Sequence, residues 1–99
     1  MAKIKWSKDS IDDLKEICRF IAEDSPYYAT LFKDRVFEMV EHVELFPEMG
    51  RKVPEADDPM VRELIYKNYR IIYQIKKGYL EIITVIHGSR LLKLKSSEN

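Results

Sequence analysis

The chain has 99 residues, of which 45% are hydrophobic and 34% charged, and its 17 basic side chains balance its 17 acidic ones. This composition predicts one globular domain with a single core, and zero net charge disfavours a protein whose only task is non-specific nucleic-acid binding. The charge is nonetheless uneven: residues 7–46 carry five basic and ten acidic side chains (net −5), and residues 50–99 carry ten and six (net +4). This asymmetry predicts a local basic face or contact with an acidic protein partner.

The first half of the chain predicts a short strand followed by two helices. Ile4–Trp6 alternates as a strand does, and Ser7 is a good N-cap because its hydroxyl can accept a backbone N–H of the first helical turn. An apolar stripe predicts a helix over about 8–23. In the turn Asp24–Pro26 the serine caps a second helix and the proline opens it. That helix runs to Phe46, and the short link predicts an antiparallel helical hairpin.

The second half predicts a loop and three strands. Glu48–Pro59 is a loop by its proline, glycine and acidic content, and Val61–Tyr66 is the first strand. A turn at Lys67–Asn68 leads into two long strands rich in β-branched and aromatic residues, which are separated by Lys77–Gly78. Gly78 adopts the positive φ of a tight hairpin turn without strain.

The period of two assigns the faces of the long strands. In the first, one face carries Tyr69, Ile71, Tyr73 and Ile75, and the other carries Arg70, Ile72, Gln74 and Lys76. In the second, one face carries Leu80, Ile82, Thr84 and Ile86, and the other carries Glu81, Ile83, Val85 and His87. Because it is apolar on both faces, we place this second strand at the centre of the sheet.

The order β-α-α-β-β-β predicts an α+β domain. An N-terminal short strand precedes an antiparallel helical hairpin, which packs on one face of a three- to four-stranded antiparallel sheet. The domain is expected over residues 1–95, with a disordered tail over 96–99. A single cysteine, Cys18, allows no internal disulfide, and no stretch approaches the roughly 20 apolar residues that span a bilayer. With no signal peptide expected, the protein is predicted to be cytoplasmic and to make no membrane contact.

A series of short motifs lies between Ile4 and Arg90 in a recognisable order and spacing. They are Trp6-Ser7, Asp13-Leu14 with Ile17, Asp24-Ser25-Pro26 with Ala29, Phe46-Pro47, Gly50-Arg51, Val53-Pro54-Glu55, Arg62-Glu63-Leu64, Tyr69-Arg70-Ile71-Ile72-Tyr73 and Val85-Ile86-His87 with Arg90. Together they resemble the RelE/ParE superfamily of bacterial toxins, closer to its ParE-like members. The resemblance implies a toxin of a type II toxin–antitoxin module that is neutralised by a cognate antitoxin protein. No metal or cofactor is expected.

The superfamily contains two functional classes. RelE- and YoeB-like members cut mRNA in the ribosomal A site without a metal, whereas ParE-like members poison DNA gyrase by contact. Cutting requires a deprotonated 2′-hydroxyl, a protonated leaving oxygen and stabilised phosphate charge. If the chain is a nuclease, the resemblance implies a site drawn from the following residues: Arg70, His87, Glu55, Arg62 and Arg90. Among them, Arg70 corresponds to the arginine that YoeB-like nucleases use on the scissile phosphate, and Glu55 lies near their carboxylate base.

A structural role competes with each of these assignments. Arg70 would equally pair with a carboxylate such as Glu63 or Glu81 on an adjacent strand, and we favour this reading. For Glu55 we favour a solvated loop residue. His87 is attractive because histidine titrates near neutrality. However, the His-Tyr pair of YoeB-like enzymes falls on Gly88 and Ser89 here, so we favour a buried histidine hydrogen-bonded to the helical hairpin.

The missing His-Tyr pair and the neutral charge favour a gyrase inhibitor without catalytic activity over a ribosome-dependent mRNA endonuclease. An inactive, antitoxin-binding member is a further alternative. Residues expected to contact the target or antitoxin are Arg51, Lys52, Arg62, Arg70, Tyr73, Arg90 and Lys93. Convergence of Arg70 and His87 with an acid on one open cleft would instead favour the nuclease.

Overall fold

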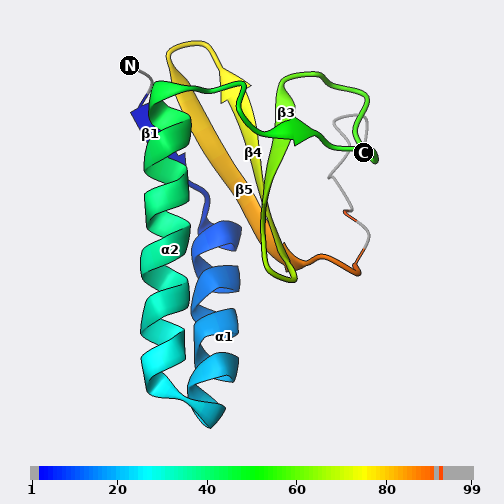
Figure 1. Ribbon diagram of the computed structural model, residues 1–99. Coiled ribbons are helices and arrows are strands. Elements are labelled where there is room, and N and C mark those ends of the chain that lie inside the picture. Colours follow the sequence, from blue (N-terminus) through cyan, green and yellow to red (C-terminus); the bar gives the residue numbers. More distant parts are fainter. Residues whose placement is uncertain (1–2, 91, 93–99) are drawn as a thin grey trace.

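Two helices lie against one face of a sheet (Figure 1). The computed structural model describes residues 3–90 and 92. The elements are β1 (Lys3–Trp6), α1 (Lys8–Asp24), α2 (Pro26–Leu45), β2 (Arg51–Lys52), β3 (Val61–Tyr66), β4 (Tyr69–Lys76) and β5 (Tyr79–His87). They confirm the α+β class and the helical hairpin, whereas the predicted tail over 96–99 lies outside the described residues. Within the described ranges, neither helix combines the length and apolar character needed to cross a membrane.

The sheet has five strands in the order β1-β5-β4-β3-β2. It is therefore larger than the three- to four-stranded antiparallel sheet that was predicted. The difference arises at its two edges, because β1 pairs with β5 in parallel and the short β2 adds to β3. Strand β4, rather than β5, is the middle strand. Strand β5 is still an interior strand between β1 and β4, which explains why both of its faces are apolar.

A β-bulge in β5 changes the predicted faces of that strand. Ile72 of β4 pairs with Thr84 but the next residue, Tyr73, pairs with Ile82, so Ile83 has no partner across the ladder. One extra residue reverses the alternation beyond it. Val85 therefore joins the buried cluster that faces the helices, and grouping it opposite Ile82 was wrong.

The start of α1 supplies hydrogen bonds to the part of β5 that β1 does not reach. Strand β1 is four residues long and β5 is nine, so among the described residues the outer edge of β5 beyond Ile82 has no strand partner. The Ser7 hydroxyl donates to the carbonyl of Ile83 at 2.9 Å. The Asp13 carboxylate accepts the hydroxyl of Thr84 and, at 3.3 Å, the backbone N–H of Val85. These contacts satisfy polar groups that would otherwise be costly to bury.

Both predicted helix caps and both predicted turns are confirmed. The hydroxyl of Ser7 accepts the N–H of Ser10 at 3.0 Å, and that of Ser25 accepts the N–H of Tyr28 at 3.2 Å. The β4–β5 turn contains Gly78 with φ of 84°.

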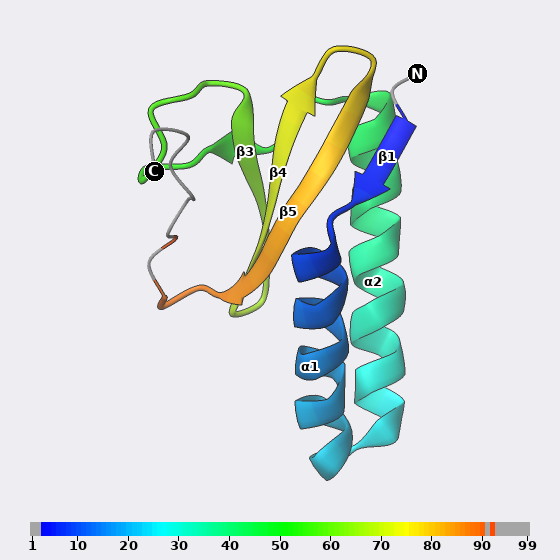
Figure 2. The same ribbon diagram turned by 180° about the vertical axis from the view of Figure 1, so that it is seen from behind.

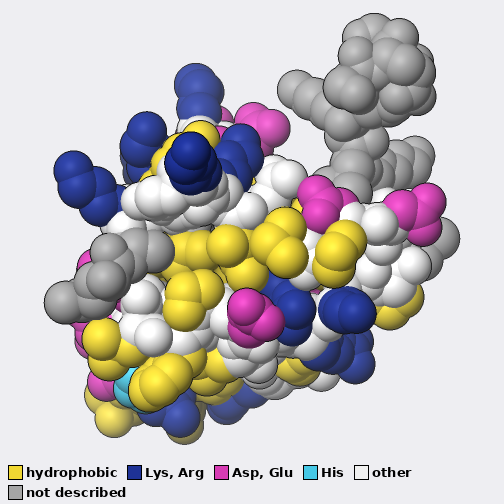
Figure 3. Space-filling model, turned by 90° about the horizontal axis from the view of Figure 1, so that it is seen from above, with side chains coloured by type: hydrophobic (Ala, Val, Ile, Leu, Met, Phe, Trp, Pro, Cys, Tyr) yellow, Lys and Arg dark blue, Asp and Glu magenta, His cyan; other side chains and the backbone are white. Residues whose placement is uncertain are grey.

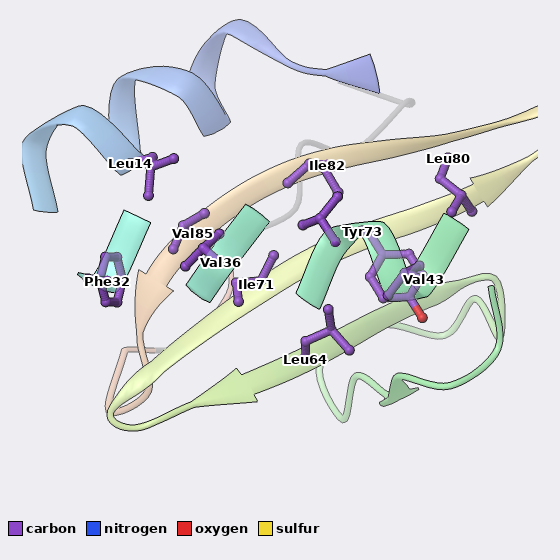
Figure 4. Packing of buried hydrophobic residues seen from close by; sticks show 11 residues of the cluster. Leu14, Phe32, Val36, Val43, Leu64, Ile71, Tyr73, Leu80, Ile82 and Val85 are labelled. Carbon is purple, nitrogen blue, oxygen red and sulfur yellow. The ribbon is translucent and has the colours of Figure 1, made fainter. Parts of the chain in front are cut away.

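The main core fills the space between the helical hairpin and the sheet (Figure 4). It contains Leu14, Phe32, Val36, Val40 and Val43 from the helices and Leu64, Ile71, Tyr73, Leu80, Ile82 and Val85 from the sheet. A second, smaller cluster of Val53, Val61 and Ile72 lies on the opposite side, which we call the outer face of the sheet. There the loop between β2 and β3, together with Leu92, covers part of the sheet.

The turn end of the helical hairpin extends beyond the ends of the strands in both views (Figures 1 and 2). Aromatic side chains are exposed near this end: Phe20 and Tyr27 are each 67% exposed and Tyr28 is 61% exposed. The sheet cannot bury them because it ends before them.

Candidate functional site

A hollow of about 660 Å3 opens where the β3–β4 turn meets the end of β5. Its lining is Arg51, Pro54, Glu55, Ile65, Lys67, Asn68, Tyr69, Arg70, His87, Gly88 and Ser89. Three residues of the nuclease hypothesis, Glu55, Arg70 and His87, therefore share one hollow. Arg62 and Arg90, the other two, are not part of its lining. Whether the three form a reactive group depends on what each already contacts.

The guanidinium of Arg70 is held by two carboxylates. Its Nε donates to Glu63 at 2.6 Å, and its Nη1 and Nη2 each donate to Glu55 at 2.8 Å. Nη1 also donates to the carbonyl of Arg90 at 3.2 Å. The residue is only 6% exposed. The predicted pairing with Glu63 is confirmed, whereas Glu81 pairs with a lysine instead.

Glu63 is itself shared between two arginines. Its side chain is fully buried, and it accepts the Nε of Arg51 at 2.5 Å as well as that of Arg70. The register of β2 against β3 places Arg51 directly opposite Glu63. Two arginines and two glutamates thus form a neutral group, the Arg70 cluster (Arg51, Glu55, Glu63 and Arg70). It ties together β3, β4, the loop after β2 and the chain that follows β5.

Glu55 is an exposed loop residue, as we predicted, but its carboxylate is bound within this cluster rather than solvated. Its side chain is 19% exposed, and besides Arg70 it accepts the backbone N–H of Leu92 at 2.9 Å. The hydrogen bonds from Arg70, and then the one from Leu92, lower the pKa of Glu55 to about 2. The same contact with Glu55 raises the pKa of Arg70 above its ordinary value. At neutral pH the pair is fully ionised, and Glu55 is a weak proton acceptor.

His87 is exposed at the end of β5, so the prediction of a buried histidine bonded to the helices was wrong. Its Nδ1 accepts the backbone N–H of Ser89 at 3.2 Å and lies 2.7 Å from the Ser89 hydroxyl. The ring packs edge-on against Tyr69, with centroids 5.5 Å apart, and Tyr69 in turn contacts Phe32 of α2. These contacts hold one edge of the ring, and the residue as a whole remains exposed to solvent.

The imidazole and the guanidinium enter the hollow from different sides of the sheet. Tyr69 and Arg70 are consecutive in β4, so their side chains point to opposite faces. His87 lies with Tyr69 on the helical side, whereas Arg70 is bonded on the outer face. The three residues therefore share a hollow without converging as a set of proton donor, proton acceptor and phosphate ligand.

Residues 4–92 match the family model described as "ParE toxin of type II toxin-antitoxin system, parDE". The chain belongs to this ParE toxin family. It is 28% identical over 92 residues to Toxin RelE2 of Caulobacter vibrioides, which covers 92% of this chain and all of that protein. Its fold resembles a chain of the chromosomal ParDE TA system from P. aeruginosa, with a TM-score of 0.72 and 20% identity over 88% of this chain and 96% of that one. These findings confirm the RelE/ParE resemblance, and they make the protein a toxin of a type II toxin–antitoxin module with an antitoxin as its partner.

Several residues that we predicted at the contact surface of this ParE-family toxin have structural roles. Tyr73 is fully buried, and its hydroxyl donates to the carbonyl of Pro47 at 2.6 Å and accepts the N–H of Gly50 at 3.0 Å. It cannot touch a partner, so this prediction was wrong. Arg62 is 14% exposed and donates to the backbone carbonyls of Gly50 and Glu48. Alternation along β3 places Arg62 on the face opposite Glu63, so it cannot act with Arg70 on one phosphate.

The remaining predicted contact residues divide by what the structure describes. Arg51, Lys52 and Arg90 are exposed, and Lys93 lies outside the described residues. Sequence reasoning missed that Glu55 is a partner of Arg70 and that Asp13 accepts hydrogen bonds from β5. In the sequence, Asp13 stood out as part of the motif Asp13-Leu14. Neither contact leaves a local signal, because the partners are 15 and 72 residues apart. Within residues 3–90 and 92, no His, Cys, Asp or Glu side chains cluster as a metal site requires.

Proposed function

We propose that this toxin inhibits DNA gyrase by binding to it, carries out no chemistry of its own, and is silenced by its cognate antitoxin. The observation that carries the proposal is the state of Arg70. Its guanidinium nitrogens already donate to Glu55 and Glu63 inside the protein.

A nuclease needs a guanidinium with free N–H groups directed at the phosphate. To reach Arg70, an RNA phosphate would have to displace a bidentate carboxylate and then lie beside it, where like charges repel. Glu55 is equally unsuited to deprotonate a 2′-hydroxyl, because its pKa of about 2 leaves little driving force for proton transfer. The hollow has the residue types of a nuclease, but the Arg70 cluster uses the arginine and the glutamate for structure.

Protein contact is better supported by the surface of the toxin. The aromatic side chains at the projecting end of the hairpin are the kind of residue that dominates protein interfaces, and the sheet does not cover them. Zero net charge also suits a protein target better than ribosomal RNA, whose counterions must be displaced by many lysines and arginines.

The test is a supercoiling and DNA-cleavage assay with purified gyrase and micromolar toxin. We expect supercoiling to be inhibited and cleaved DNA to accumulate, and gyrase that is unaffected refutes the proposal. The double variant Phe20→Ser/Tyr27→Ser should weaken inhibition, since it removes exposed aromatic contacts without touching the core. His87→Gln is the matched control and should inhibit as the wild type does, because contact inhibition gives the hollow no chemical task.

A ribosome-dependent mRNA endonuclease is the second candidate, favoured by the single observation that Arg70, Glu55 and His87 line one hollow. It predicts codon-phased cuts in translated mRNA that disappear in Arg70→Ala and in His87→Gln. The histidine variant is decisive because the arginine variant also disturbs the fold. Uncut transcripts in cells arrested by the toxin rule this candidate out. Harmless induced expression would instead indicate an inactive, antitoxin-binding member.

The antitoxin interaction is tested separately by co-expression with the product of the neighbouring small reading frame. We expect the two chains to copurify. Induced expression without that product then separates the candidates in time: an early DNA-damage response supports gyrase as the target, and early translation arrest supports mRNA.

A further inference from the structure

The outer face also carries a group of lysines that the candidate site does not use. Lys3 and Lys5 lie on β1, Lys76 lies on β4, and Lys77 lies in the adjoining turn. They surround Tyr79, the first residue of β5. We call these five residues the lysine face. Seen from above, several Lys and Arg side chains surround apolar ones at one corner of the molecule, and others lie nearer its middle and lower edge (Figure 3).

Three strands hold the lysine face together. The Nζ of Lys5 lies 4.4 Å from the centroid of the Tyr79 ring, and that of Lys76 lies 5.7 Å from it. Lys3 and Lys76 are the direct neighbours of Tyr79 in the β1–β5 and β4–β5 ladders. Residues more than 70 positions apart are thus brought to one ring. The ammonium groups are attracted to the face of the tyrosine, which positions them side by side.

Little negative charge compensates this group. Glu81 pairs with Lys76 at 2.8 Å, and Asp58 borders the face through a 3.2 Å bond to Gln74. Within residues 3–90 and 92, Lys3, Lys5 and Lys77 form no ion pair. Four lysines and Glu81 leave a net charge of +3. Such a group repels itself unless an anionic partner lies against it.

The helical side of the toxin carries the opposite charge. Residues 7–46, which form the helical layer on the other side of the sheet, carry a net charge of −5. Although its net charge is zero, the toxin therefore has a charge dipole, with an acidic helical side and a basic outer face. A polyanion would attract the molecule with the lysine face foremost and repel it in the opposite orientation.

We propose that the lysine face binds the phosphate backbone of duplex DNA without sequence preference. Lysine ammoniums are point charges that contact phosphates, and the face has no arginine fork for reading base edges. Tyr79 already packs against ammonium groups and is not a free platform for stacking unpaired bases, which excludes single strands. Acidic peptide motifs are typically recognised by arginine clusters, whereas this face offers lysine ammoniums and one ring. The choice of DNA over duplex RNA rests on the proposed function.

Fluorescence anisotropy with a labelled duplex DNA of mixed sequence tests this directly, with no gyrase present. We expect a Kd of about 1–100 μM at physiological salt, as for other non-specific binders. Three phosphate contacts, from Lys3, Lys5 and Lys77, predict a slope of log K against log salt of about −2.7. The variant Lys3→Gln/Lys5→Gln/Lys77→Gln should bind at least about tenfold more weakly, with a slope near zero. Lys76 is left in place because it pairs with Glu81.

The matched control is Lys15→Gln/Arg19→Gln/Lys33→Gln, which removes the same charge from exposed positions on the helices. It should bind DNA as the wild type does, and circular dichroism should show both variants folded. Equal loss in the two variants, or no binding by the wild type at 100 μM, overturns the inference. Tighter binding to a duplex RNA or to poly-glutamate of equal charge also overturns it. Gyrase inhibition without DNA binding refutes only this inference, and DNA binding without gyrase inhibition refutes only the proposed function.

Discussion

Replacing Arg70 by methionine removes a buried charge while keeping much of the side-chain length. The change leaves the fully buried Glu63 carboxylate with Arg51 alone, and the Arg51 side chain is 64% exposed. It also leaves Glu55 with the backbone N–H of Leu92. Breaking a buried ion pair from one side typically costs about 3–5 kcal/mol, because the remaining charge loses its compensation but stays out of water.

We expect Arg70→Met to lower the free energy of unfolding by about that amount. Domains of this size are usually stable by about 5–15 kcal/mol, so the loss is a large fraction of the total. Since 1 kcal/mol shifts the melting midpoint of a small domain by about 4–8 °C, the midpoint should fall by about 12 °C or more. Thermal and urea unfolding followed by circular dichroism measure both quantities.

Arg35→Met is the control for this experiment. Arg35 pairs with Glu38 on the surface of α2, where both side chains are more than half exposed, and such pairs contribute about 1 kcal/mol or less. The double variant Arg70→Met/Glu63→Leu removes both charges and should cost less than the sum of its single changes. If Arg70→Met melts within a few degrees of Arg35→Met, the Arg70 cluster does not hold the domain together and our reasoning fails.

Three further predictions concern acid stability and backbone packing. The pKa of Glu55, about 2, lies below its ordinary value of 4.5. Its contribution to the free energy of unfolding is therefore present above about pH 4.5 and is lost as the pH falls toward 2. Glu55→Gln should flatten the acid limb of a plot of melting midpoint against pH. Gly50→Ala places a Cβ 2.6 Å from the Tyr73 hydroxyl oxygen and should cost about 1–3 kcal/mol by urea unfolding; a midpoint equal to that of the wild type would contradict the close approach. Asp13→Ala leaves the N–H of Val85 and the Thr84 hydroxyl unpaired. It should lower the free energy of unfolding by about 1–3 kcal/mol and speed amide exchange at Val85. Unchanged exchange there would show that α1 does not stabilise that edge of β5.

Much of the fold follows from short-range rules that a single sequence displays. Ser7 and Ser25 cap helices because a hydroxyl lies three residues before the N–H it accepts, and Gly78 permits a turn by its own conformational freedom. The alternation in β4 likewise separates Ile71 on the helical side from Ile72 on the outer face, as predicted. Each of these signals lies within a few residues of the structure that it determines.

The candidate site depended on contacts that close over long stretches of chain. Whether Arg70 is a phosphate ligand or a structural residue turns on Glu55, whose loop must fold back over the outer face before the two meet. The bulge at Ile83 shifts the faces of β5 by one residue, and no local pattern marks it. The sequence revealed a basic half without its location, because only the pairing of β1 with β5 brings Lys3 and Lys5 to Tyr79. Local chemistry thus determined the elements, and their tertiary pairing decided which charges are neutralised and which remain free to meet a partner.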